Sequence, residues 1–321
     1  MRDSHDRLID YMRVSITDRC NLRCRYCMPD DLPLLSHDDI LRYEEIIRLC
    51  EIFAKIGIRA IKVTGGEPLA RKGCVEFIGE LKARTAIEHV TLTTNAVLLE
   101  PYVEKLAGLK LDGINISLDS LDSETYKKIT GKNEFHRVWR SLNAAVEAGL
   151  CVKINMVPIK GINERDIVSI VRLAETLPIN VRFIELMPTG VNNGFKGISG
   201  IEIRRLLQKI YLDLTPDLSA YGFGPASYFK SKLLKRSIGF IKSFDNHFCE
   251  SCNRVRLTSE GYLKLCLYQE DGLELRRMLR SGASDNEIEA AIAQAIYQKP
   301  KHRYVNANQN GEIKKMSRIG G

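Results

Sequence analysis

The chain has 321 residues, a formal net charge of +8 at pH 7, and 44% apolar and 27% charged residues. This is the composition of an ordinary globular protein, and no uninterrupted apolar run approaches the roughly 18 residues of a membrane span. We therefore expect no membrane association, and the polar N-terminal stretch, which has no apolar signal region, predicts a cytoplasmic location.

Apolar, β-branched runs alternate with amphipathic helical stretches along the first part of the chain, the pattern of successive βα units around a parallel sheet. Strands are predicted at residues 12–17, 60–64, 89–93, 113–118, 152–157 and 181–186. Helices are predicted at residues 38–56, 74–84, 101–106, 137–148 and 163–177. Six units instead of the eight of a full barrel predict an α/β fold, a partial (βα)6 TIM-like barrel with its chemistry at the carboxyl ends of the strands.

The pattern loosens between residues 190 and 239 into loops that contain Gly, Asn and Pro, with one helix predicted near residues 202–210. We interpret this stretch as the passage out of the barrel. The sequence therefore predicts a barrel domain of residues 1–190 and a C-terminal region of residues 191–321.

Three cysteines follow the first predicted strand in the spacing C-x3-C-x2-C: Cys20, Cys24 and Cys27. Iron-sulfur cubes take four ligands, usually all thiolate, so three local cysteines leave one iron open to a ligand that is not protein. The alternative is a zinc knuckle, which prefers four closed ligands that often come as paired C-x2-C units. One such pair with an offset thiol favours the iron-sulfur cluster.

Three further cysteines are spaced C-x2-C-x13-C: Cys249, Cys252 and Cys266. On spacing alone, a structural zinc ion completed by His247 or by a remote side chain fits this set as well as an iron-sulfur cluster does. Arg254 and Arg256 stand beside the cysteines. Because forked guanidinium groups recognise phosphates and carboxylates, these arginines favour a cluster that handles a ligand.

The first cysteine set, with Tyr26 before its last cysteine, resembles the signature of the radical S-adenosylmethionine (SAM) enzymes. That resemblance implies that the open iron binds SAM, and that the reduced cluster cleaves it to methionine and a 5′-deoxyadenosyl radical. Residues 63–68, Val-Thr-Gly-Gly-Glu-Pro, are similar to the loop that accepts the SAM ammonium group, which implicates Gly66. Ser117, at the end of the fourth predicted strand, matches a SAM-contacting position.

Across essentially the whole chain the motifs resemble more specifically the GTP 3′,8-cyclase (MoaA) family of molybdenum cofactor biosynthesis. The resemblance is carried by Arg13, Met-Pro after Cys27, the Thr-Gly-Gly-Glu-Pro loop, Arg-Phe-Ile-Glu-Leu-Met at 182–187, residues 247–258 and the terminal Met-Ser-Arg-Ile-Gly-Gly. It implies two [4Fe-4S] clusters and a C-terminal region that closes the barrel. The second cluster is implied to lie in that region and to bind the guanine of GTP. The same resemblance implies that the radical removes the ribose 3′ hydrogen and that the carbon radical closes onto C8 of the base.

The resemblance also implies roles for individual residues of this sequence. Those implied to contact SAM are Tyr26, Gly66, Ser117 and Met187. Those implied to bind GTP are Arg13, Lys62, Thr93, Lys153, Arg182, Arg254 and Arg256. Those implied to be catalytic are Arg13, Arg254, Arg256, Gly320 and Gly321. Two positions depart from the family pattern: Ala96 replaces a glycine, and Lys62 replaces an arginine and so loses the bidentate fork.

The resemblance implies GTP as substrate, a downstream cyclic pyranopterin monophosphate synthase, a flavodoxin- or ferredoxin-type reductant and a homodimer, with no nucleic-acid or membrane partner. A radical SAM enzyme that modifies a peptide or another small molecule through an auxiliary cluster is the second interpretation. A zinc-stabilised nucleic-acid-binding module is the third, but the chain lacks interleaved basic and aromatic residues on one element. The terminal Gly-Gly favours the cyclase over the second interpretation.

Overall fold

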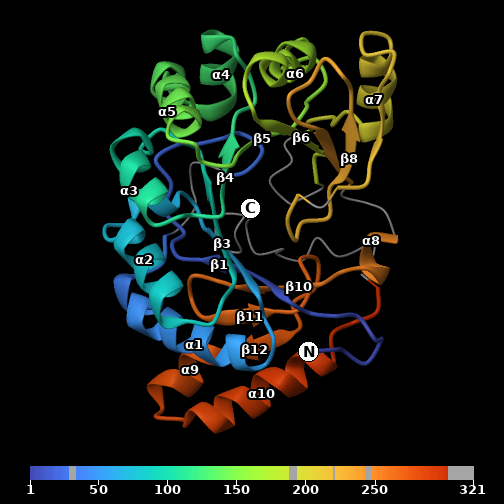
Figure 1. The fold of residues 1–321 in the computed structure, drawn as a ribbon. Helices are drawn as coiled ribbons and strands as arrows, with labels where there is room; N and C mark the ends of the chain where they lie inside the picture. Colours follow the sequence, from blue (N-terminus) through green and yellow to red (C-terminus); the bar gives the residue numbers. More distant parts are fainter. Residues whose placement is uncertain (29–33, 188–193, 220, 243–246, 303–321) are drawn as a thin grey trace. The chain divides into compact units, whose positions relative to one another are not determined.

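The computed structural model describes residues 1–28, 34–187, 194–219, 221–242 and 247–302 (Figure 1). The chain forms two compact units. The first unit draws on Met1–Asn21, Asp30–Leu92 and Asn246–Gly321, and the second on Leu22–Pro29 and Thr93–Asp245. The predicted domain boundary at residue 190 lies outside the described residues, and that division stays a prediction.

The strands of the first unit follow the order β12-β11-β10-β1-β2-β3. Their bounds are β1 Tyr11–Ser15, β2 Ala60–Thr64, β3 His89–Thr94, β10 Arg254–Leu257, β11 Tyr262–Lys264 and β12 Gly272–Glu274. β1 pairs in parallel with both β2 and β10, while β11 and β12 are antiparallel additions. The C-terminal part of the chain therefore extends the parallel sheet beside the first strand.

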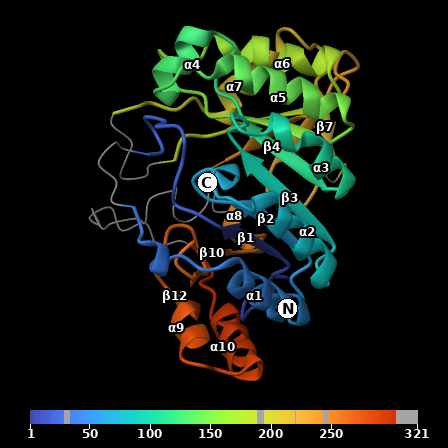
Figure 2. The same cartoon turned by 90° about the vertical axis from the view of Figure 1, so that its left-hand side faces the viewer.

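The longer helices of the first unit bury rows of apolar side chains. The helices of this unit are η1 His37–Asp39, α1 Tyr43–Lys55, η2 Pro68–Ala70, α2 Cys74–Arg84, α8 His247–Glu250, α9 Leu275–Arg280 and α10 Asp285–Tyr297. α10 begins at a capping box in which the Glu287 backbone N–H donates to the Ser284 hydroxyl at 3.3 Å. It buries Ile288, Ile292 and Ile296, one per turn. Figures 1 and 2 both show α10 alongside α1.

The strands of the second unit follow the order β4-β5-β6-β9-β8-β7. Their bounds are β4 Gly113–Ser117, β5 Val152–Met156, β6 Asn180–Ile184, β7 Thr215–Asp217, β8 Ser227–Lys230 and β9 Ile238–Ile241. β4, β5, β6 and β9 are parallel, and β8 and β7 are antiparallel. The helices are η3 Glu100–Tyr102, α3 Val103–Gly108, α4 Ser123–Thr130, α5 Phe135–Glu147, α6 Asp166–Thr176 and α7 Gly200–Gln208.

The six predicted parallel strands and the alternation with helices are confirmed, and β2 and α2 have the predicted bounds. The interpretation of residues 190–239 as loops with one helix was wrong in part, because β7, β8 and the start of β9 lie there beside the expected α7. These strands have three or four residues, too few for a period-two pattern to emerge. No helix within the described ranges is long and apolar enough to cross a membrane.

Candidate active site

A row of basic side chains crosses four neighbouring strands of the first unit. In register, Arg13 of β1 lies opposite both Lys62 of β2 and Arg256 of β10, and Arg256 lies opposite Lys264 of β11. Side chains alternate between the faces of a strand, so these four positions share one face of the sheet. Three of them were predicted from the family resemblance as GTP ligands, and Lys264 was not.

The neighbours of these cations on the strands are apolar and point to the other face. Met12, Val14, Ile61, Val63 and Val255 are at most 1% exposed. This buried alternation fixes the register, because a slip of one residue would exchange the two faces. Packing of the apolar face thereby aligns the basic one.

Arg256 is a buried arginine that lies among like charges. It is 8% exposed. Burial, followed by repulsion from Arg13 and Arg254, lowers the pKa of Arg256 well below its ordinary value. A site with this concentration of positive charge is suited to a polyanion such as a triphosphate.

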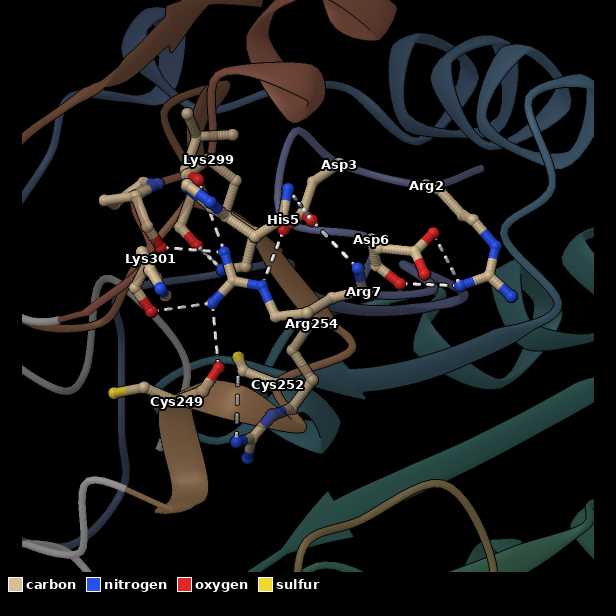
Figure 3. A network of polar contacts seen from close by, with 12 residues as sticks. Arg2, Asp3, His5, Asp6, Arg7, Cys249, Cys252, Arg254, Lys299 and Lys301 are labelled. Carbon is tan, nitrogen blue, oxygen red and sulfur yellow. Dashed lines mark hydrogen bonds and ion pairs between the residues drawn. The ribbon is translucent and has the colours of Figure 1, made fainter.

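The second cysteine set lies in the same unit as this basic row. The Cys252 backbone N–H donates to the Cys249 carbonyl oxygen at 3.3 Å, so a tight turn joins these two cysteines. Burial alone would raise the pKa of the Cys252 thiol, but the charges of Lys299 and Arg254 outweigh it and lower that pKa to about 7. Figure 3 shows the Arg254 guanidinium beside the Cys252 sulfur, at 3.9 Å from Nη2 to Sγ.

Gly66 packs against the backbone immediately before Cys20. A Cβ atom at position 66 would lie 2.6 Å from the Arg19 carbonyl carbon, and the Glu67 backbone N–H donates to the Arg19 oxygen at 2.8 Å. Only glycine allows this approach. This contact explains on structural grounds why position 66 is a glycine, in addition to the SAM role that the resemblance implies.

The remaining two cysteines of the first set share one turn in the second unit. Both the Cys27 and the Met28 backbone N–H groups donate to the Cys24 carbonyl oxygen at 2.9 Å. Tyr26, within this turn, donates its hydroxyl hydrogen to Asp119 Oδ2 at 2.7 Å. Burial and then the Asp119 charge raise the pKa of Tyr26 well above its ordinary value, so the phenol stays protonated as the donor.

Asp119 was not predicted as a site residue, yet it anchors this turn. Burial raises its pKa to about 6, although the Val157 backbone N–H and Tyr26 both donate to its carboxylate. The Asn163 amide donates to the Asp119 carbonyl oxygen at 2.9 Å and to the Val157 oxygen at 3.0 Å. Polar residues alternate along residues 115–119, Asn-Ile-Ser-Leu-Asp, and this pattern is the sequence signal that could have identified Asp119.

A second basic group in the second unit centres on Arg182, which is 5% exposed. Its Nε donates to Asn155 Oδ1 at 2.9 Å and its Nη2 donates to Asn115 Oδ1. The Asn115 amide in turn lies 3.5 Å from the Thr93 hydroxyl. No carboxylate pairs with Arg182 among the residues that the structure describes. The site thus includes Asn115 and Asn155, which sequence reasoning missed.

Lys153 lies beside Arg182 and is held by a loop. Its ammonium donates to the Tyr221 carbonyl oxygen. Burial, then repulsion from Arg182, lowers the pKa of Lys153 to about 8. The structure therefore brings together Thr93, Lys153 and Arg182, three of the predicted GTP ligands, within the second unit.

Of the remaining predicted positions, Ser117 and Met187 are described and the two terminal glycines are not. Ser117 ends β4 and Met187 follows β6, and both are half-buried. Ala96 has a φ of 62°, so this turn adopts the left-handed conformation even though it lacks the family's glycine. Gly320 and Gly321 lie outside the described residues, and their role stays a prediction.

The cysteines of the chain supply the donor chemistry that iron-sulfur clusters need. All nine cysteines are thiols, and each predicted set includes two cysteines joined by a turn. Within the described ranges, no three His, Cys, Asp or Glu side chains are grouped closely enough to hold a metal ion. The cationic surroundings of Cys252 favour the thiolate that binds iron, so the second set fits a cluster in its chemistry.

Two family profiles match consecutive parts of the chain. The profile of the Radical SAM superfamily matches residues 14–174, and that of Molybdenum Cofactor Synthesis C matches residues 179–305. The chain is 42% identical to the GTP 3′,8-cyclase of Moorella thermoacetica and 40% identical to that of Thermodesulfovibrio yellowstonii. Both alignments cover 100% of this chain and 100% of the relative.

Solved structures with a similar fold are more distant in sequence. Streptococcus suis SuiB bound to S-adenosylmethionine superimposes with a TM-score of 0.63 at 16% identity, over 89% of this chain and 69% of SuiB. The hydrogenase maturase HydG from Carboxydothermus hydrogenoformans gives a TM-score of 0.51 at 19% identity, over 63% of this chain and 51% of HydG. At these identities the likeness concerns the fold alone.

Proposed function

Because this chain belongs to the GTP 3′,8-cyclase family of radical SAM enzymes, we infer that it converts GTP into (8S)-3′,8-cyclo-7,8-dihydroguanosine 5′-triphosphate, the first step of molybdopterin synthesis. The observation that carries this inference is the identity of about two residues in five along the whole length of curated cyclases. A match of this kind includes both the SAM-dependent part and the C-terminal part.

The enzyme uses SAM and two [4Fe-4S] clusters. When bound, they supply the radical that removes the ribose 3′ hydrogen and an open iron that holds the guanine base. Cys20, Cys24 and Cys27 would hold the first cluster, and Cys249, Cys252 and Cys266 the second. Tyr26, Gly66, Ser117 and Met187 would contact SAM.

The basic groups of the two units suit the substrate. We propose that basic side chains bind the triphosphate of GTP, since charge-assisted hydrogen bonds to phosphate are the strongest that a protein can offer. These are Arg13, Lys62, Lys153, Arg182, Arg254 and Arg256, with Thr93 as a neutral ligand. Buried guanidinium groups held in place by amides or strand register are ordered before the substrate arrives, which lowers the entropic cost of binding.

Further partners form part of this proposal. The product requires a cyclic pyranopterin monophosphate synthase downstream, and the first cluster requires a one-electron donor of the flavodoxin or ferredoxin type. A homodimer is also proposed from the family. A cytoplasmic location accords with nine cysteines that are all thiols, since disulfides are rare in reducing compartments.

Anaerobic incubation with SAM, dithionite and each nucleoside triphosphate in turn tests the activity. GTP alone should yield the cyclised triphosphate, together with 5′-deoxyadenosine. The reconstituted chain should hold about eight irons, and a triple Cys249, Cys252, Cys266→Ser variant about four. That variant should still cleave SAM without cyclising GTP. Zinc with half the iron in the unmutated chain would overturn the second cluster.

We also propose that Gly320 and Gly321 act in turnover and not in substrate affinity. Loss of an interaction made chiefly in the transition state lowers kcat and leaves binding alone. Gly321→Ala should therefore nearly abolish cyclisation while GTP still binds. Normal turnover after deletion of both glycines would remove them from the mechanism.

A further inference from the structure

Arg7 ties together three parts of the first unit that are far apart in sequence. Its Nη1 donates to the carbonyl oxygens of Cys249 at 2.8 Å and Lys301 at 3.0 Å, and its Nη2 donates to those of Pro300 at 2.7 Å and Lys299 at 3.3 Å. Its Nε donates to Asp3 Oδ2 at 2.7 Å. Figure 3 shows the Arg7 guanidinium between the 299–301 segment and the Cys249 backbone.

Lys299 uses this fixed backbone to direct a buried ammonium group toward the second cysteine set. Lys299 is 2% exposed, and its Nζ donates to the Leu265 carbonyl oxygen, one residue before Cys266. Its charge interacts with the thiols of both Cys252 and Cys266. The segment held by Arg7 therefore reaches two of the three cysteines, and Arg7 itself reaches the backbone of the third.

A nearby anion would stabilise the charged form of Lys299, because burial lowers the pKa of this ammonium group while the charges of Cys252 and Cys266 oppose that shift. A buried ammonium costs several kcal/mol unless an opposite charge is close. No carboxylate pairs with Lys299 among the described residues, and the other charges acting on it are those of Arg7 and Arg254, which are positive. Cys252 and Cys266 would supply that opposite charge as thiolates, the form in which cysteines hold a metal cluster.

We propose that Lys299 is the charge-compensating residue of the second iron-sulfur cluster and that Arg7 is its positioning residue. This rests on the proposed function in so far as Cys249, Cys252 and Cys266 hold that cluster. A cluster held by thiolates is anionic and gains a further negative charge on one-electron reduction. An ammonium group beside it stabilises the reduced form more than the oxidised form and so raises the reduction potential.

Redox titration of the reconstituted holoenzyme, followed by electron paramagnetic resonance, tests the role of Lys299. The second-cluster signal is the one absent from the Cys249, Cys252, Cys266→Ser variant. Lys299→Met should lower the equilibrium constant for one-electron reduction by tenfold or more, a shift of about 59 mV to lower potential. Lys299→Arg should restore most of the shift because it retains the charge.

Lys301→Met is the matched control, since it removes the same charge from the same segment but at an exposed side chain. It should leave the potential unchanged. Loss of second-cluster iron in Lys299→Met, with retention in Lys299→Arg and Lys301→Met, would equally support charge compensation. Equal potentials for Lys299→Met and Lys301→Met would overturn the proposal.

Arg7→Lys tests the positioning role, because one ammonium group cannot donate to four separate carbonyl oxygens. It should shift the potential in the same direction as Lys299→Met, while Arg2→Lys, at an exposed arginine that contacts Asp6, should not. An unshifted potential in Arg7→Lys would remove Arg7 from the role. If the potentials shift as expected but GTP is not cyclised, the proposed function fails and this inference stands.

Discussion

The substitution Asn115→Asp tests whether the charge of Arg182 serves GTP binding, because it neutralises that charge and leaves the guanidinium group in place. The side chain of Asn115 is 3% exposed, and its Oδ1 accepts from Arg182 Nη2. Aspartate has nearly the same shape as asparagine, so the substitution places a carboxylate against the guanidinium with little change in packing. The charge of Arg182, which no carboxylate neutralises in the described structure, would then be neutralised within the protein.

Two opposing terms decide the effect on stability. An ion pair about 4 Å apart gains about 4 kcal/mol at an effective dielectric constant near 20. Burial of the new carboxylate costs several kcal/mol, which offsets most of that gain. We therefore expect the free energy of unfolding to change by less than about 2 kcal/mol. GTP, in contrast, should lose about 1.5 to 3 kcal/mol of charged hydrogen bonding, roughly a 10- to 150-fold weaker affinity.

Asn115→Leu is the control with the opposite pattern. It removes the acceptor and leaves a buried guanidinium N–H without its partner, which should lower the free energy of unfolding by about 1 to 3 kcal/mol. The charge of Arg182 remains available, so GTP affinity should fall less than in Asn115→Asp. Urea denaturation gives the stabilities, and anaerobic equilibrium dialysis gives the affinities for GTP and SAM. If Asn115→Asp binds GTP as tightly as the unmutated chain, the charge of Arg182 does not serve the triphosphate.

Three further substitutions give distinct readouts. Gly66→Ala would place Cβ 2.6 Å from the Arg19 carbonyl carbon. We therefore expect the iron content of the first cluster and the rate of SAM cleavage to fall, while GTP affinity persists. Normal SAM cleavage would refute the packing argument. The pKa of Asp119 is raised to about 6, so the folded state binds this proton more tightly than the unfolded state. As pH rises from about 4 to 6, this group should therefore lower the free energy of unfolding by on the order of 2–3 kcal/mol. Asp119→Asn should flatten that part of the stability curve, and an unaltered curve would contradict the assignment. Arg254→Ala should weaken GTP binding by about 1.5 to 3 kcal/mol and leave SAM binding nearly unchanged, whereas equal losses for both ligands would indicate misfolding.

Periodicity alone predicted the strands and helices whose pattern is long enough to be seen. The strand at 60–64 and the helix at 74–84 have their predicted bounds because apolar side chains recur at the right spacing and Gly73 marks the start of the helix. α10 went unpredicted although its sequence contains both signals, Ser284 three residues before Glu287 and isoleucines spaced by four. The local sequence around this helix therefore contains the information that specifies it.

The residues of the candidate site were less predictable from local sequence than the strands and helices. Family resemblance pointed to Arg13 and Lys62, and its place beside the second cysteine set pointed to Arg256. The physical basis of the basic row is the register between strands that are some 240 residues apart in sequence. Asn115 and Asn155 look like ordinary polar positions of half-buried strands until Arg182 is placed between them. Arg7 and Lys299 are separated by 292 residues and carry no local signal at all.

Electrostatic cost links these observations. Arg256 is buried beside two like charges, and Arg182 and Lys299 are buried with no carboxylate to neutralise them in the described structure. Each arrangement lowers the stability of the protein without its ligands, because desolvated charge is compensated only in part by hydrogen bonds. An anion that binds the folded state removes that cost, and binding to the folded state alone stabilises it by mass action. The positive charges that make this fold costly are thus the same groups that a triphosphate and an anionic cluster would stabilise, so ligand binding and folding stability are expected to rise together.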